Sequence, residues 1–123
     1  MYRIEIDDIP PSMNQYWAGR HWTWRKQIAD KWHLLFLAAF RSAKLPKKLK
    51  WPIAINTTEF CKGPVRDADN AVIANKLCQD TLVQHGYLPD DGPMYVPTVI
   101  LNTQKGKQNK TVIVIMELST IGE

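Results

Sequence analysis

The order in which strand-like and helix-like segments follow one another restricts this chain to few folds. Apolar and polar residues alternate in YRIEI, at positions 2–6, as they do in a half-buried strand. Two helical patterns follow, and WPIAINTTEF, which is rich in strand-forming residues, stands between them. Two further strand-like segments, VPTVILNT and TVIVIMEL, come last. The order βαβαββ predicts an α+β (mixed α/β) domain, with two helices packed on a small mixed sheet of about four strands.

Both helical patterns have recognisable ends. Thr23 is suited to cap the first helix, and Pro46 stops it. The second helix is expected from about Asp69 to His85, and Gly86 suits a left-handed cap. In the first helix, apolar residues recur at helical spacing and should face the core: Trp24, Ile28, Trp32, Leu35, Ala39 and Ala43.

The last two strand segments are joined through QKGKQNK, which predicts a hairpin with a basic tip. Its lysines could contact phosphate, or they could be solvated and keep a sheet edge from aggregating. These residues are Lys105, Lys107 and Lys110.

Length and composition set further limits. The 123 residues suffice for one compact domain, residues 1–123, with its own core. The formal net charge of +4 suits a phosphate-bearing partner, although many proteins carry similar charge for solubility alone. Cys61 and Cys78 lack partners at zinc-finger spacing, so reduced thiols are expected. Because LLFLAAF is too short to span a bilayer and no signal peptide is recognised, we expect a cytoplasmic protein without a membrane segment.

Carboxylates cluster in the middle of this basic chain. In RDADN, Asp67 and Asp69 lie two positions apart, so in extended backbone their side chains share a face and could share an ion. Taken alone, either residue could equally be a helix cap or a turn residue. Asp90 and Asp91 precede a Gly-Pro pair and could simply form a β-turn.

A stripe along the second helix links some of these residues. At about 100° per residue, Lys76 and Asp80 fall on the same side of the helix as Asp69. An ordinary i,i+4 ion pair explains Asp80 adequately. Lys76, between the two acids, could instead balance a carboxylate cluster or contact a phosphate.

Oxygen ligands of this kind select a hard cation, magnesium or manganese, over zinc. Such an ion can activate water and neutralise charge during phosphodiester hydrolysis. The sequence contains no Ser-His-Asp pattern, P-loop or GxGxxG motif that points to another chemistry.

Four segments in this order, PPSMNQYW, RDADN, KLCQDTL and HGYLPDD, resemble the RusA-type Holliday junction resolvases, the family of crossover junction endodeoxyribonucleases. The resemblance covers most of the chain, and the spacing from DN to the lysine is similar to that of phage-type relatives. It implies a homodimeric, magnesium-dependent endonuclease, with manganese as a possible substitute, that resolves four-way DNA junctions by paired symmetric incisions. The implied metal ligands are Asp67, Asp69 and Asp91, and the implied essential lysine is Lys76.

Other residues are candidates for supporting roles. Asn70 and Arg66 match the surrounding signature, and Asp80 and Asp90 are secondary acids of the proposed site. Trp17 and Trp22 could stack on unpaired bases or could equally close the core. DNA affinity is expected to come chiefly from phosphate contacts, with these polar residues as candidates: Arg66, Lys62, Asn14, Arg20, Arg25, Lys26, Lys105, Lys107 and Lys110.

Two other functions stay open. The chain could be a nuclease for a broader range of branched DNA, because these residues explain hydrolysis better than junction preference. It could also be a nucleic-acid-binding module that cuts nothing and whose carboxylates are structural. Several carboxylates facing a phosphate backbone would repel it without a cation, which favours the enzyme.

Overall fold

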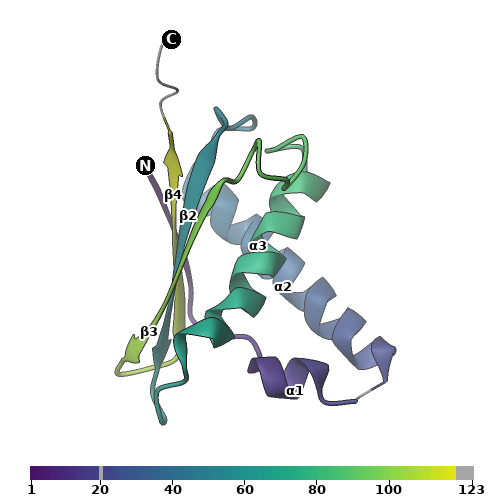
Figure 1. The fold of residues 1–123 in the computed structure, drawn as a ribbon, viewed down its shortest axis with the longest axis vertical. Helices are drawn as coiled ribbons and strands as arrows, with labels where there is room; N and C mark the ends of the chain where they lie inside the picture. The colour runs from purple at the N-terminus through teal and green to yellow at the C-terminus, as the bar shows by residue number, and fades with distance from the viewer. Residues whose placement is uncertain (20, 119–123) are drawn as a thin grey trace.

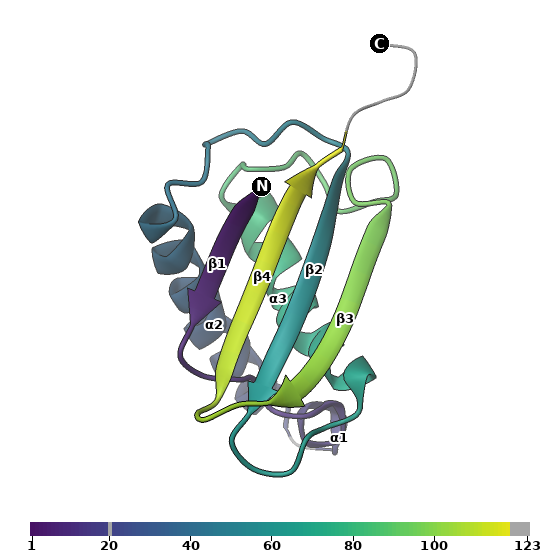
Figure 2. The same ribbon diagram turned by 90° about the vertical axis from the view of Figure 1, so that its left-hand side faces the viewer.

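The computed structural model of this chain describes residues 1–19 and 21–118. Figure 1 shows a mixed sheet seen along its edge with the helices on one side, and Figure 2 faces the side of the sheet that the helices leave uncovered. The predicted α+β class, with a small four-stranded sheet, is confirmed. The elements are β1 (Tyr2–Ile6), α1 (Met13–Trp17), α2 (Trp22–Ser42), β2 (Ile53–Cys61), the 3-10 helix η1 (Ala68–Ala71), α3 (Val72–Gln84), β3 (Thr98–Lys105) and β4 (Lys110–Glu117).

The strand order is β1-β4-β2-β3. Strands β2 and β3 are parallel, and η1 and α3 form the connection between them on the helix-covered face. Strand β4 lies between β1 and β2 and is antiparallel to both. The central place of β4 means that the N-terminal strand pairs with the last strand.

The predicted hairpin of the last two strands is wrong, because β3 and β4 are separated by β2. Their short connection crosses the end of β2, where Gly106 N–H donates to the Cys61 carbonyl at 3.0 Å. A Cβ atom at Gly106 would lie 2.8 Å from Cβ of Phe60. Glycine is therefore required where the connection passes over the strand.

Helix α2 differs from its predicted pattern in two respects. Its N-cap is His21, whose Nδ1 accepts a hydrogen bond from Thr23 N–H at 3.3 Å, so Thr23 lies inside the helix and the predicted cap is wrong. Its buried residues are Trp32, Phe36 and Phe40. The other predicted core positions of this helix are only partly buried: Trp24, Ile28, Leu35, Ala39 and Ala43. The apolar stripe is centred on the aromatic residues, whose rings fill the space above the sheet.

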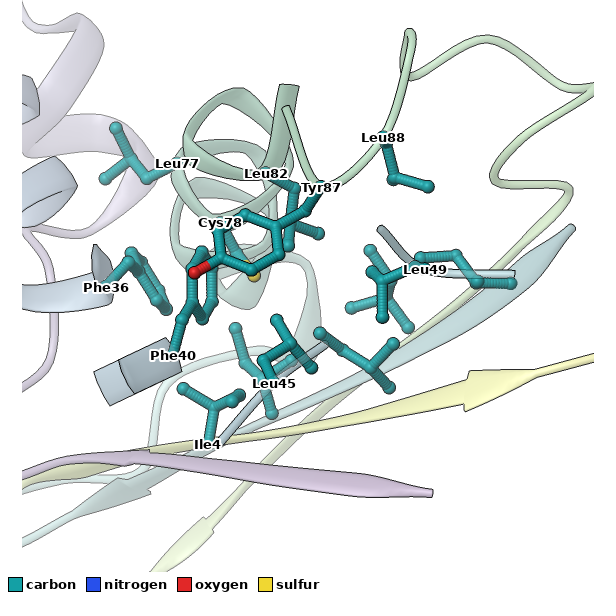
Figure 3. Close-up of a cluster of buried hydrophobic side chains, with 14 of the residues drawn as sticks. Ile4, Phe36, Phe40, Leu45, Leu49, Leu77, Cys78, Leu82, Tyr87 and Leu88 are labelled. Atoms are coloured by element: carbon teal, nitrogen blue, oxygen red, sulfur yellow. The ribbon is translucent and has the colours of Figure 1, made fainter. Parts of the chain in front are cut away.

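Helix α3 is the buried centre of the helical layer. It follows η1 directly, and Gly86 after it has a φ of 77°, as expected of a left-handed cap. Figure 3 shows side chains of α3 and of the segment after it, including Leu82 and Tyr87, packed toward Phe40 of α2 and Ile4 of β1. Burial of this kind stabilises the fold by roughly 1.5–3 kcal/mol for each large apolar side chain.

Both cysteines are buried and unpaired, which agrees with the reduced thiols expected from the sequence. Burial raises the pKa of the Cys78 thiol far above its usual range, so this sulfur stays protonated. Among the described residues, no helix combines the length and the apolar character that crossing a membrane requires.

Candidate active site

A lysine on α3 is held between two carboxylates. Lys76 Nζ lies 3.1 Å from Asp91 Oδ2 and 3.3 Å from Asp80 Oδ1. We call these three residues the lysine cluster. The predicted i,i+4 contact of Lys76 with Asp80 is thus confirmed, and the turn after α3 brings Asp91 to the same lysine. All three side chains are at least 30% exposed, so the cluster is accessible to a large ligand.

The charges of the lysine cluster stabilise one another. The hydrogen bond to Asp91 raises the pKa of Lys76, and the Asp80 carboxylate adds to this effect. The same hydrogen bond lowers the pKa of Asp91. Lys76 is therefore a cation and Asp91 an anion throughout the neutral range.

Asp90 contacts the backbone of Asp91. Its Oδ1 accepts a hydrogen bond from Asp91 N–H at 2.8 Å, and its side chain is exposed. The hydrogen-bonded turn follows at Gly92–Tyr95, where Gly92 O accepts hydrogen bonds from Tyr95 N–H and Val96 N–H. Asp90 and Asp91 thus precede this turn, and Asp91 contacts Lys76.

Asp67 and Asp69 lie on the segment that leads into α3. Asp67 is the N-cap residue of η1 but makes no capping bond through its side chain, and Asp69 lies within η1. Both are exposed. A 3-10 helix has about 3 residues per turn, so the α-helical stripe calculation does not extend back to Asp69. The helical spacing thus predicted correctly that Lys76 and Asp80 lie on one side of α3, but it does not give the direction of the Asp69 side chain.

The side chains of Arg66 and Asn70 tie this acidic segment to the loop before α1. Arg66 Nη1 donates to the Pro10 carbonyl at 2.8 Å, and Asn70 Oδ1 accepts from Met13 N–H at 2.9 Å. Asn70 Nδ2 also donates to the Asp67 carbonyl at 3.1 Å. Two segments that carry the family resemblance, PPSMN and RDADN, are thus hydrogen-bonded to each other.

Sequence reasoning missed a buried acid beneath this segment. Glu59 on β2 is fully buried, and its Oε1 lies 3.5 Å from Arg66 Nη1. Burial raises its pKa to about 7 even though Arg66 lowers it, and its Oε2 has no hydrogen-bond partner. The sequence pattern that could have revealed its burial is the period-two alternation of β2, which places Glu59 on the helix-covered face with the buried Ile55 and Thr57. We call Glu59, Arg66 and Asn70 the loop brace.

The carboxylates fit a hard metal ion in chemistry but are not assembled as one ligand set. Asp67, Asp69 and Asp91 offer only oxygen donors, as magnesium and manganese prefer. Within residues 1–19 and 21–118, however, no three His, Cys, Asp or Glu side chains are grouped so that they could hold an ion. What the described chain does assemble is the lysine cluster.

The predicted DNA-binding residues have different surroundings. Lys105 Nζ donates to the carbonyls of Lys62, at 2.5 Å, and Gly63, at 3.0 Å, so it holds the loop after β2. Three others have exposed side chains: Asn14, Lys62 and Lys107. Arg20 lies outside the described residues.

Lys26 and Lys110 contact acids elsewhere. Lys26 pairs with Asp30 at 2.8 Å, and Lys110 pairs with Glu5 at 3.2 Å.

The sequence left base stacking and core packing as alternatives for two tryptophans, and the structure decides on the second. Trp17 and Trp22 are 60% and 59% exposed, so neither ring closes the core.

Comparison with known proteins adds no assignment, since no protein-family model and no curated protein matched this chain.

Proposed function

We propose that this protein is a metal-dependent endodeoxyribonuclease that resolves Holliday junctions by paired symmetric incisions. The observation that best supports this proposal is the position of Lys76, within 3.3 Å of carboxylates from both α3 and the following turn. An accessible cation beside acids, on the helix that follows the exposed Asp67 and Asp69 in the sequence, is suited to a phosphodiester substrate.

In this proposal, Asp67, Asp69 and Asp91 would hold magnesium, or manganese in its place. When bound, the ion would supply activation of water and neutralisation of charge on the phosphate. Lys76, charged at neutral pH, would donate hydrogen bonds to a phosphate oxygen. The loop brace would keep Asp67 and Asp69 at a fixed position relative to α1.

The proposed substrate and assembly follow from symmetry and charge. A homodimer would match the approximate two-fold symmetry of a four-way junction and present one site to each of two opposed strands. Exposed polar residues near the RDADN segment, such as Lys62, would contact the DNA backbone. A cytoplasmic location, where chromosomal or phage DNA is accessible, goes with this proposal.

One observation favours a second candidate, a DNA-binding module that cuts nothing. The described residues do not gather three potential metal ligands, and Lys76 already has carboxylate partners. In that case the lysine cluster would be a surface ion-pair network. A nuclease for other branched DNA remains an alternative within the enzyme class, since nothing in the lysine cluster is specific to four-way junctions.

Cleavage of synthetic DNA separates these candidates. Purified protein is incubated with a four-way junction and with linear duplex, with and without magnesium, alongside Asp69→Asn and a control, Asp30→Asn on α2. We expect magnesium-dependent cutting of the junction that only Asp69→Asn abolishes, while junction binding persists because a negative charge has been removed. Full activity of Asp69→Asn would refute the site. Junction binding without cutting by the unmodified protein would establish the module, and cutting of flaps and forks at equal rates would establish the broader nuclease.

A further inference from the structure

A mostly apolar pocket of about 300 Å³ opens between α1, α2 and α3. Its lining includes the aromatic rings of Tyr16 and Trp17, together with Val72 and Leu77 of α3. Lys76 and Asp80 of the lysine cluster form its polar edge. The pocket therefore adjoins the proposed active site and shares two of its residues.

Of the two aromatic rings, Tyr16 packs against the core, whereas Trp17 does not. Helix α1 has no buried residue, and the Trp17 ring is 60% exposed. Tyr16 and Trp17 pack edge to face with ring centroids 5.0 Å apart, which gives the Trp17 ring a fixed support. The guanidinium carbon of Arg25 lies over the Trp17 ring, 5.5 Å from its centroid, and so covers one face of the ring. A supported aromatic ring with a cation over one face can stack a nucleic-acid base on its other face.

The polar edge carries both a donor and an acceptor. Lys76 offers an ammonium group, and Asp80 offers a carboxylate. A nucleobase has a flat apolar face and an edge with both acceptor and donor groups. The pocket is complementary to such a ring on both counts, whereas a wholly apolar ligand would make no use of the donor and the acceptor at its edge.

We propose that this pocket binds an unpaired nucleobase of branched DNA, stacked on Trp17 with its edge toward Lys76 and Asp80. This inference rests on the proposed function, and it adds a source of selectivity for branched DNA. Taking a base out of a regular duplex costs a few kcal/mol, and the cost is lower where the base is already unpaired, as at a branch point. The nucleotide that enters the pocket would have its own phosphate beside the lysine cluster.

Fluorescence and affinity measurements test the proposal without cutting. A four-way junction carries 2-aminopurine at the branch point, and binding is followed in EDTA with unmodified protein, Trp17→Ala, Trp17→Phe and Trp51→Ala. Trp51 is the matched control, because its ring is 45% exposed and packs edge to face on Tyr95, as Trp17 does on Tyr16, but does not line the pocket. We expect Trp17→Ala to weaken junction binding roughly 5- to 150-fold, the range that base stacking gives, and to leave duplex binding unchanged. Trp17→Phe should retain most of the affinity, and Trp51→Ala should change the binding of neither DNA.

Several outcomes would overturn the proposal that the pocket binds a base. Equal losses in Trp17→Ala and Trp51→Ala would show a general effect of the surface. An altered sedimentation coefficient of Trp17→Ala without loss of junction selectivity would show a protein contact instead. Cutting of the junction in magnesium with no change of 2-aminopurine fluorescence would refute the pocket and leave the nuclease standing. If the unmodified protein neither binds nor cuts the junction, both proposals fail. Should Trp17→Ala not fold, Val72→Phe fills the same pocket from α3 and must weaken junction binding in the same way.

Discussion

The loop brace precedes the lysine cluster in the sequence, and the two differ in how exposed their charged groups are. Lys76 is 61% exposed and contacts its carboxylate partners at the surface, whereas Glu59 of the brace is fully buried and contacts Arg66. Exposed ion pairs typically contribute about 0–1 kcal/mol to stability, but an unpaired buried charge costs several kcal/mol. The brace is thus expected to maintain the fold around the site, and the cluster is free to act on a ligand.

The largest effect on stability is expected from Arg66→Met, which leaves Glu59 buried without a cation and Pro10 O without a donor. At pH 8, urea unfolding should show a loss of about 3–5 kcal/mol in the free energy of unfolding. Lys31→Met is the control, because Lys31 also lies 3.5 Å from a carboxylate, that of Asp8, but at the surface. The control should lose less than about 1 kcal/mol. Equal losses in both variants would remove the contrast between the two regions.

The next largest effect is a pH dependence due to Glu59. Its pKa is about 7 in the folded protein against a usual value of 4.5, so the folded state binds the proton more tightly than the unfolded chain. The stability that this proton provides is complete below pH 4.5 and is lost as the pH rises through about 7, a change of about 3 kcal/mol. Urea unfolding of the unmodified protein and Glu59→Gln, compared between pH 4.5 and 8, should show this slope in the difference between them. A constant difference over this range would contradict the assignment.

The smallest effect on stability is expected from Lys76→Met, because the cluster is exposed. Its free energy of unfolding should change by less than about 1 kcal/mol. Under the proposed function, the rate of junction cleavage should nevertheless fall by roughly 100-fold or more, as when a transition-state donor is removed. Lys31→Met removes the cation of another exposed ion pair, that with Asp8, and should keep full activity. A Lys76→Met variant that cuts normally would make the cluster a surface ion pair.

Local patterns in the sequence predicted local structure well. The helical patterns, the strand YRIEI and the glycine cap at Gly86 depend on neighbouring residues, and so does the contact of Lys76 with Asp80. The hairpin was wrong because a short polar connection can join strands that are not neighbours. Strands two places apart in a sheet are roughly 10 Å apart, and four extended residues span about 13 Å. Nothing in the spacing separates the two topologies.

Long-range contacts of the site were equally hard to predict. The contact of Asp91 with Lys76 depends on how the turn after α3 folds back, and that of Glu59 with Arg66 depends on the loop after β2. Glu59 in particular stands in a strand whose other inward residues do not ionise, so only the period-two alternation, and not the composition, indicated a buried acid. Whether Asp67 and Asp69 share a metal ion with Asp91 stays a prediction for the cleavage experiments.

The position of β4 between β1 and β2 has a consequence for synthesis of the protein on the ribosome. In the sheet as described, Tyr2–Ile6 pairs with β4 alone, so these residues have no strand partner until β4, more than 100 positions later, has been translated. Contacts between residues so distant in the sequence are formed slowly, because a large loop must close first. A nascent chain that ends before Lys110 would leave the β4-facing edge of β2 unpaired, and such a fragment is expected to aggregate or to require a chaperone.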